Sequence, residues 1–124
     1  MQSLTVVVAH ADSFAAQQLS DNLRAHFRKV ALASNHLELR EAIARTRASL
    51  VVVDMDLIPM DELKEICADF AATGVVCVHR APDYEMWKEA TSAGALECCH
   101  PTDIPSILNA MRTRPVAKSR AIAA

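Results

Sequence analysis

Short runs of aliphatic, mostly β-branched residues alternate along the chain with stretches in which apolar residues recur every three or four positions. The runs lie at Leu4–Ala9, Val30–Ala33, Leu50–Val53, Val75–Val78 and Leu96–Cys99. Each run has the length of a buried β-strand, and the spacing between runs is typical of amphipathic helices. The pattern therefore predicts five strands and five helices in strict alternation.

Residues that begin and end helices support this alternation. Short polar side chains can accept a hydrogen bond from the first helical turn, which predicts N-caps at Ser13, Asn35 or Ser34, Asp83 and Asp103. Gly74 and Gly94 follow the third and fourth predicted helices. We therefore expect both glycines to close a helix in the left-handed conformation.

Strands that are apolar on both faces, with a helix between each pair, are typical of a parallel sheet covered on both sides. Right-handed crossovers then favour an α/β fold, a doubly wound three-layer αβα sandwich. For five strands we expect a parallel sheet of order 2-1-3-4-5. We assign one domain to residues 1–112 and a basic, disordered tail to residues 113–124.

Composition limits the classes of protein that this chain can belong to. Of its 124 residues, 52% are hydrophobic and only 4% aromatic, which predicts one aliphatic core. Two glycines cannot form a phosphate-binding glycine-rich loop, so dinucleotide and P-loop binding are excluded. No apolar run approaches the roughly 18 residues that cross a membrane. Without an export signal, Cys67, Cys77, Cys98 and Cys99 are interpreted as reduced core residues of a cytoplasmic protein.

Charge is distributed unevenly along the chain. The net charge is −2, yet residues 112–124 carry four basic residues and no acidic one. Residues 1–111 therefore carry a net charge of −6. An acidic domain of this kind is not expected to bind nucleic acid.

Polar residues gather where the predicted strands end, which is where parallel α/β sheets place their ligands. These residues are His10, Asp12, Asp54, Asp56, His79 and His100. Asp54 is the most informative, because a carboxylate that directly follows Leu-Val-Val-Val needs solvent, a partner or a function. We therefore regard Asp54 as the centre of the candidate site.

From residue 4 to about residue 112 the chain resembles the receiver domains of two-component response regulators, which have a flavodoxin-like fold. The best match is LVVVDMDLIPMDEL at Leu50–Leu63, similar to the family's third strand, its phosphoacceptor aspartate and the start of its third helix. A second match is Ala93-Gly94-Ala95 followed by Cys99-His100-Pro101, where the family's fifth strand ends in Lys-Pro. The resemblance implies a non-enzymatic module in phosphorelay signalling, with Asp54 as phosphoacceptor and a histidine kinase or other signalling protein as partner.

The family's helper residues differ in this chain. The acidic pair that holds Mg²⁺ maps to His10 and Ala11, with Asp12 one position later. The hydroxyl residue after strand four maps to His79, the lysine after strand five to His100, and the switch aromatic to Glu97. Mg²⁺ prefers oxygen ligands, which here would be Asp12, Asp54 and Asp56. We therefore expect weakened Mg²⁺-dependent phosphorylation and a pseudo-receiver that acts mainly through protein contacts.

Two alternatives remain at this point. The chain can be a working receiver that is phosphorylated on Asp54. It can instead be a transition-metal-binding or purely structural pseudo-receiver that uses His10, His79 and His100, because imidazoles suit Zn²⁺, Ni²⁺ or Cu²⁺ better than Mg²⁺.

The resemblance also implies a partner surface, and a homodimer contact, on helix four, strand five and helix five. Residues of that surface are Tyr84, Trp87, Glu97, Ile107 and Met111. Trp87 has two interpretations, as a partner contact or as a cover for the core. Exposure of its indole beside other apolar side chains favours the first.

Overall fold

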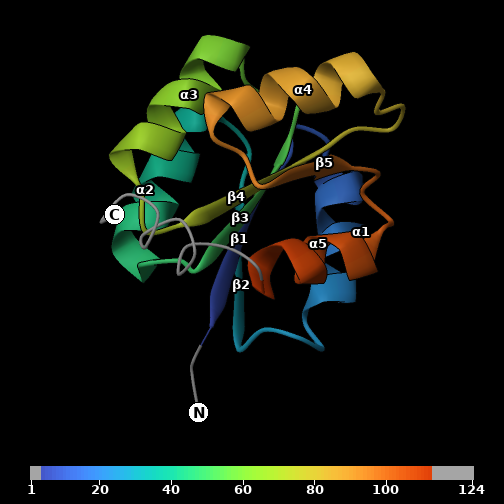
Figure 1. The fold of residues 1–124 in the computed structure, drawn as a ribbon. Coiled ribbons are helices and arrows are strands. Elements are labelled where there is room, and N and C mark those ends of the chain that lie inside the picture. Colours follow the sequence, from blue (N-terminus) through green and yellow to red (C-terminus); the bar gives the residue numbers. More distant parts are fainter. Residues whose placement is uncertain (1–3, 113–124) are drawn as a thin grey trace.

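A computed structural model describes residues 4–112 of the chain, and the predicted tail at residues 113–124 lies outside them. Strands and helices alternate as predicted (Figure 1). The elements are β1 (Thr5–Ala9), α1 (Ser13–Leu23), β2 (Lys29–Ala33), α2 (His36–Thr46), β3 (Leu50–Asp54), α3 (Met60–Asp69), β4 (Gly74–Val78), α4 (Tyr84–Ala93), β5 (Glu97–Cys99) and α5 (Ile104–Arg112). All strand pairs are parallel, in the order β2-β1-β3-β4-β5, which confirms the predicted fold class and strand order.

The sheet separates two apolar clusters, because alternate residues of a strand point to opposite faces. Val7 and Val51 pack beneath α2, α3 and α4, whereas Val8 and Val52 pack beneath α1 and α5. These four valines are fully buried. Burial on both faces explains why the central strands consist of valine rather than of alternating polar and apolar residues.

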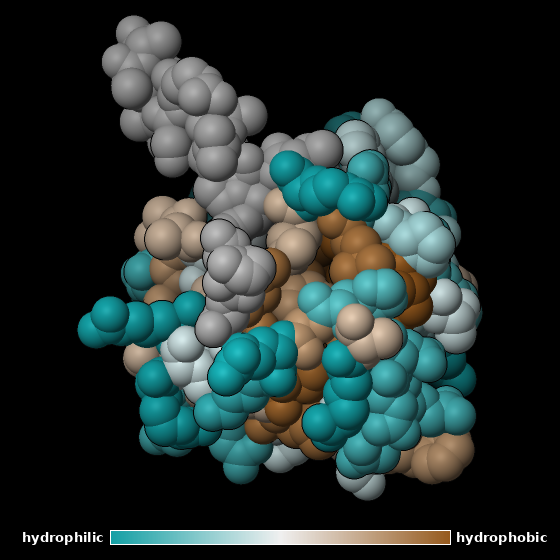
Figure 2. All heavy atoms as spheres, turned by 90° about the horizontal axis from the view of Figure 1, so that it is seen from below, coloured by the Kyte–Doolittle hydropathy of each residue, from teal (hydrophilic) through white to brown (hydrophobic). Residues whose placement is uncertain are grey.

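Two helices, α1 and α5, cover one face of the sheet, and three helices, α2, α3 and α4, cover the other. Several apolar residues packed against the cluster beneath α1 and α5 are only partly buried, among them Val30, Leu108 and Met111. Figure 2, a view from below, shows apolar surface between polar side chains on this side of the molecule. Within residues 4–112 no helix combines the length and apolar character that crossing a bilayer requires.

Three helix N-termini follow the sequence prediction and one does not. Asn35 accepts a hydrogen bond from Glu38 N, Asp83 from Met86 N and Asp103 from Ser106 N. The predicted cap at Ser13 is wrong: Ser13 is the first helical residue, and Asp12 Oδ1 accepts from Phe14 N at 3.0 Å. Asp12 has extended backbone angles and therefore occupies the cap position.

The two glycines have different roles. Gly94 ends α4 with φ at +118°, as predicted, and a Cβ there would lie 2.7 Å from Cys67 Cβ. The same prediction for Gly74 is wrong. Helix α3 ends at Phe70 with a negative φ, residues 71–73 follow, and Gly74 is already the first residue of β4, paired with Leu50.

None of the four cysteines, all within residues 4–112, forms a disulfide. Cys77 and Cys98 lie on the face beneath α2–α4, and Cys99 lies on the opposite face. Burial raises the pKa of the Cys77 thiol well above its usual range and raises that of Cys99 to about 12. These thiols therefore stay protonated and behave as core residues.

Candidate functional site

A cleft of about 500 Å³ lies at the edge of the sheet where the strands end. Its lining includes His10, Asp12, Asp54, Asp56, Arg80 and His100. Helix α1 forms one wall and contributes the amide side chains of Gln18 and Asn22. The topology explains this convergence, because the carboxyl ends of all parallel strands meet at one edge.

Asp54 is the last residue of β3 and pairs in register with Val78 of β4. Its side chain is 11% exposed, and it is the only charged residue among those buried within residues 4–112. Oδ2 lies 3.7 Å from His10 Nε2, which is too long for a direct hydrogen bond. A buried carboxylate with no closer partner is costly, and its opening to the cleft supplies the solvent contact that it needs.

The other two aspartates are less available. Asp12 lines the cleft, but its Oδ1 is engaged as the N-cap of α1. Asp56 is largely exposed, and its Oδ1 lies 3.3 Å from His79 Nε2. Asp54 and Asp56 thus each have an imidazole Nε2 beside the carboxylate.

The three histidines at the strand ends share one local geometry. In each, Nδ1 accepts a hydrogen bond from the backbone N–H two residues later: His10 from Asp12 at 3.1 Å, His79 from Ala81 at 3.0 Å and His100 from Thr102 at 3.1 Å. A backbone N–H can only donate, so Nδ1 must be the acceptor. The neutral rings therefore carry their proton on Nε2.

The histidines do not converge on a common point. His10 faces Asp54, His79 faces Asp56 and lies outside the cleft lining, and Nδ1 of His100 contacts the hydroxyl of Thr102 at 2.8 Å. Within residues 4–112 no three His, Cys, Asp or Glu side chains are grouped as a metal site requires. The structure thus gives no support to the three-imidazole metal site.

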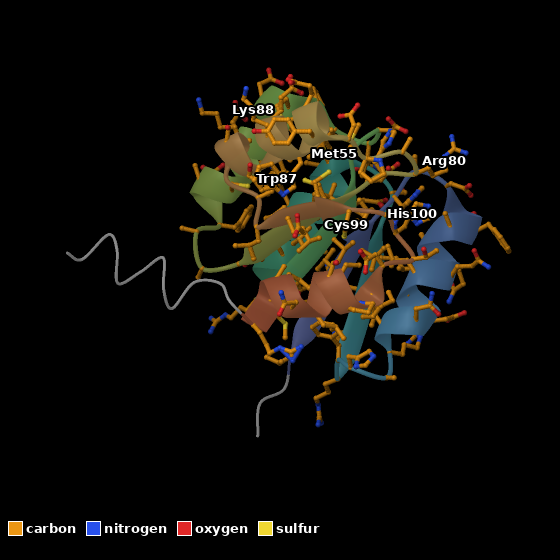
Figure 3. All side chains as sticks on the ribbon, turned by 45° about the vertical axis from the view of Figure 1, so that its right-hand side comes forward. Met55, Arg80, Trp87, Lys88, Cys99 and His100 are labelled. Atoms are coloured by element: carbon orange, nitrogen blue, oxygen red, sulfur yellow. The ribbon has the colours of Figure 1, made fainter. Side chains whose placement is uncertain are left out.

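Arg80 is a site residue that the sequence analysis did not select. It follows His79 directly after β4, and it lines the same cleft as His100. In Figure 3 Arg80 and His100 lie on the side of the molecule next to α1, away from Trp87 on α4. The available signal was its position at a strand end, in a chain that lacks the expected lysine at position 100.

Comparison with known proteins gives matches among solved structures only: no protein-family model matches the sequence, and no curated protein matches it. A response regulator from Thermotoga maritima superimposes with a TM-score of 0.79 at 18% identity, over 90% of this chain and 100% of that one. The response regulator domain of Thermotoga maritima CheB gives 0.75 at 20% identity, over 92% and 100%. A Burkholderia pseudomallei response regulator, whose structure contains a phosphorylated aspartic acid, calcium and citrate, gives 0.78 at 18%, over 98% and 73%. This chain has the receiver fold.

Receiver domains bind a divalent cation beside the phosphoacceptor, which makes the donor set of this cleft the relevant test. Magnesium requires nearly octahedral oxygen ligands. Here Ala11 supplies no side-chain oxygen, Asp12 caps α1, and an imidazole N–H lies beside each remaining carboxylate. The residues present are therefore a poor fit to Mg²⁺.

The α4–β5 face of this receiver fold presents an aromatic pair. The rings of Tyr84 and Trp87 stack at 5.9 Å, and the residues are 67% and 40% exposed. Trp87 Nε1 donates to Glu97 Oε1 at 2.8 Å, which joins α4 to β5. The exposure favours the partner-contact interpretation of Trp87. Ile107 is fully buried and does not belong to this surface, because it faces the sheet from α5.

Proposed function

We propose that this chain is a non-enzymatic, receiver-like signalling module in a two-component phosphorelay, with Asp54 as candidate phosphoacceptor in an altered pocket. One observation carries the proposal: a nearly buried carboxylate stands at the end of the central strand β3 and opens onto a cleft. Four buried apolar residues precede it, so its charge has no role in packing. A histidine kinase or another signalling protein is the proposed phosphodonor.

The output of such a module is proposed to be contact with a partner protein. The stacked Tyr84–Trp87 pair supports this, because large exposed aromatic side chains are enriched where proteins bind each other. The same α4–β5–α5 surface is proposed to mediate a homodimer.

Intact-mass measurement after incubation with phosphoramidate and Mg²⁺ tests the phosphoacceptor. We expect the protein to gain the mass of one phosphoryl group, and Asp54→Asn to gain none. Asp61→Asn, an exposed aspartate at the start of α3, is the matched control and should be modified like the unaltered protein. Failure of the unaltered protein to gain a phosphoryl group, or full modification of Asp54→Asn, would overturn the assignment.

Sedimentation velocity over a range of protein concentrations tests the proposed contact surface. We expect self-association that Trp87→Ser weakens by about 10-fold, the magnitude of one aromatic contact at an interface. Leu37→Ser, which changes an exposed apolar residue on α2, is the control and should leave association unchanged. A monomer at all concentrations removes the homodimer from the proposal.

A further inference from the structure

We infer that this cleft receives phosphoryl oxygens on imidazole N–H groups and the Arg80 guanidinium, without a divalent cation. The inference deepens the proposed function and rests on Asp54 as phosphoacceptor. It assigns His10 and Arg80 as phosphoryl-binding residues.

A backbone hydrogen bond fixes the tautomer of His10. Its Nδ1 accepts the Asp12 N–H at 3.1 Å, so the proton of the neutral ring lies on Nε2. Nε2 is directed toward Asp54 at 3.7 Å, beyond hydrogen-bond length. The N–H donor is therefore not used by the carboxylate and remains available to an oxygen bound beside it.

The strand order places groups of two other strands on either side of Asp54. In the sheet β3 lies between β1 and β4, so Asp54 is flanked by the chain segments that follow those two strands. His10 follows β1, and His79 and Arg80 follow β4. A phosphoryl group on Asp54 thus has an imidazole on one side and a guanidinium-bearing turn on the other. His100, after β5, lines the same cleft.

Arg80 can compensate the negative charge of a phosphoryl group in this cleft. A phosphoryl group carries negative charge on three oxygens, and these must be compensated for transfer to occur. Guanidinium is always charged and offers planar, paired N–H donors that match phosphate geometry. Arg80 therefore supplies the cation that the cleft has in place of a lysine at position 100.

The same hydrogen bonds disfavour metal ligation by these imidazoles. A histidine that ligates a metal through one nitrogen normally donates the N–H of the other nitrogen to an acceptor. Here the other nitrogen already accepts from a backbone donor in His10, His79 and His100. To bind a metal through Nε2, the neutral ring would have to carry its proton on Nδ1, which instead accepts the backbone N–H. Metal ligation therefore requires these turns to open.

The proposed transfer balances without a metal. A carboxylate oxygen of Asp54 attacks the phosphorus of phosphoramidate, and a new O–P bond forms. The nitrogen of the phosphoramidate zwitterion already carries three protons. The P–N bond breaks, its electron pair stays on nitrogen, and neutral ammonia leaves, so no further proton is needed. The three remaining phosphoryl oxygens accept hydrogen bonds from Nε2–H and guanidinium groups.

The experiment compares the rate of phosphoramidate modification in excess EDTA with the rate in Mg²⁺, followed by intact mass. We expect equal rates. His10→Asn is the decisive variant, because an asparagine side chain can still accept the N–H two residues later while the Nε2 donor is lost. We expect His10→Asn and Arg80→Gln each to slow modification at least about 10-fold, as for loss of one oxyanion donor.

Matched controls are His26→Asn and Arg45→Gln, which change exposed residues away from the cleft and should leave the rate unchanged. Arg80 is exposed, so Arg80→Gln is expected to fold even if His10→Asn does not. Modification that requires Mg²⁺ overturns this inference and leaves the proposed function standing. Metal-independent modification that neither site variant slows overturns the assignment of donors. No modification in either buffer overturns the proposed phosphoacceptor as well.

Discussion

The interior of the sheet and its carboxyl edge are adjacent in sequence but differ in the kinds of residue that they contain. Val78 is buried at the end of β4, and His79 is the next residue. The interior is aliphatic, and the chain as a whole superimposes on the compared receiver structures at identities of only 18–20%. The edge carries the imidazoles of His10, His79 and His100. We therefore expect substitutions at the edge to destabilise the fold less than substitutions in the interior.

Truncation of a central interior residue should have the largest effect on stability. Leu50 is fully buried in β3, so Leu50→Ala should lower the free energy of unfolding by about 2–5 kcal/mol. His10→Asn at the edge keeps an acceptor for the Asp12 N–H and should lower it by about 1 kcal/mol or less. Urea unfolding, followed by the fluorescence of Trp87, measures both. A larger loss from His10→Asn than from Leu50→Ala would show that the edge, too, determines the fold.

Alkaline pH tests the interior through its thiols. The pKa of Cys99 is raised from 9.0 to about 12 by burial, so the unfolded chain ionises first as pH rises. The unfolded state then binds fewer protons than the folded state, and the free energy of unfolding falls between pH 9 and pH 12.

Urea unfolding at a series of alkaline pH values measures this fall. Cys99→Ala removes one of the ionising groups and should reduce the slope against pH, whatever the stability of the variant at neutral pH. An unchanged slope would contradict the buried-thiol explanation.

Substitutions at the two helix ends with positive φ should have opposite signs. Gly94→Ala places a Cβ at φ +118° and 2.7 Å from Cys67 Cβ, so we expect a loss of about 1–3 kcal/mol. Arg47 ends α2 at φ +52°, and Arg47→Gly should stabilise by up to about 1 kcal/mol. Thermal unfolding by circular dichroism measures both changes. Equal signs would mean that backbone conformation does not control these ends.

The smallest expected effect lies on the α4–β5 face. Trp87→Phe removes the indole N–H that bonds Glu97 and should lower the free energy of unfolding by about 1 kcal/mol. Glu97→Gln keeps an acceptor oxygen and should lose less. Circular dichroism during urea unfolding detects the difference. A greater loss from Glu97→Gln would indicate that the charge of Glu97, rather than the hydrogen bond, stabilises this face.

The fold could be predicted from the sequence because its determinants are local and periodic. Runs such as Val51–Val53 identify strands, and the caps at Asn35 and Asp83 identify helix starts. The errors fall at boundaries. Ser13 and Asp12 are both good capping residues, and only the backbone decides between them. The prediction for Gly74 was wrong because the sequence does not distinguish a glycine that ends a helix from one that begins the next strand.

The site was predicted only in part. Strand order correctly brings His10, Asp54 and His100 to one cleft. The direction of each imidazole depends on the turn that follows its strand, where a backbone N–H captures Nδ1. Sequence spacing holds no information about that capture. For the same reason the sequence pointed to His79 rather than to Arg80, although of these two residues only Arg80 lines the cleft.

The positions that meet at the cleft, from residue 10 to residue 100, span most of the folded chain. No excised half-length fragment can contain the whole cleft, because its lining comes from residues 10–22, 54–56, 80 and 100–102. A chain dominated by contacts between distant positions folds more slowly. Assembly of this pocket is therefore tied to completion of the whole sheet, and a newly made chain cannot present it until the last strand has been synthesised and paired.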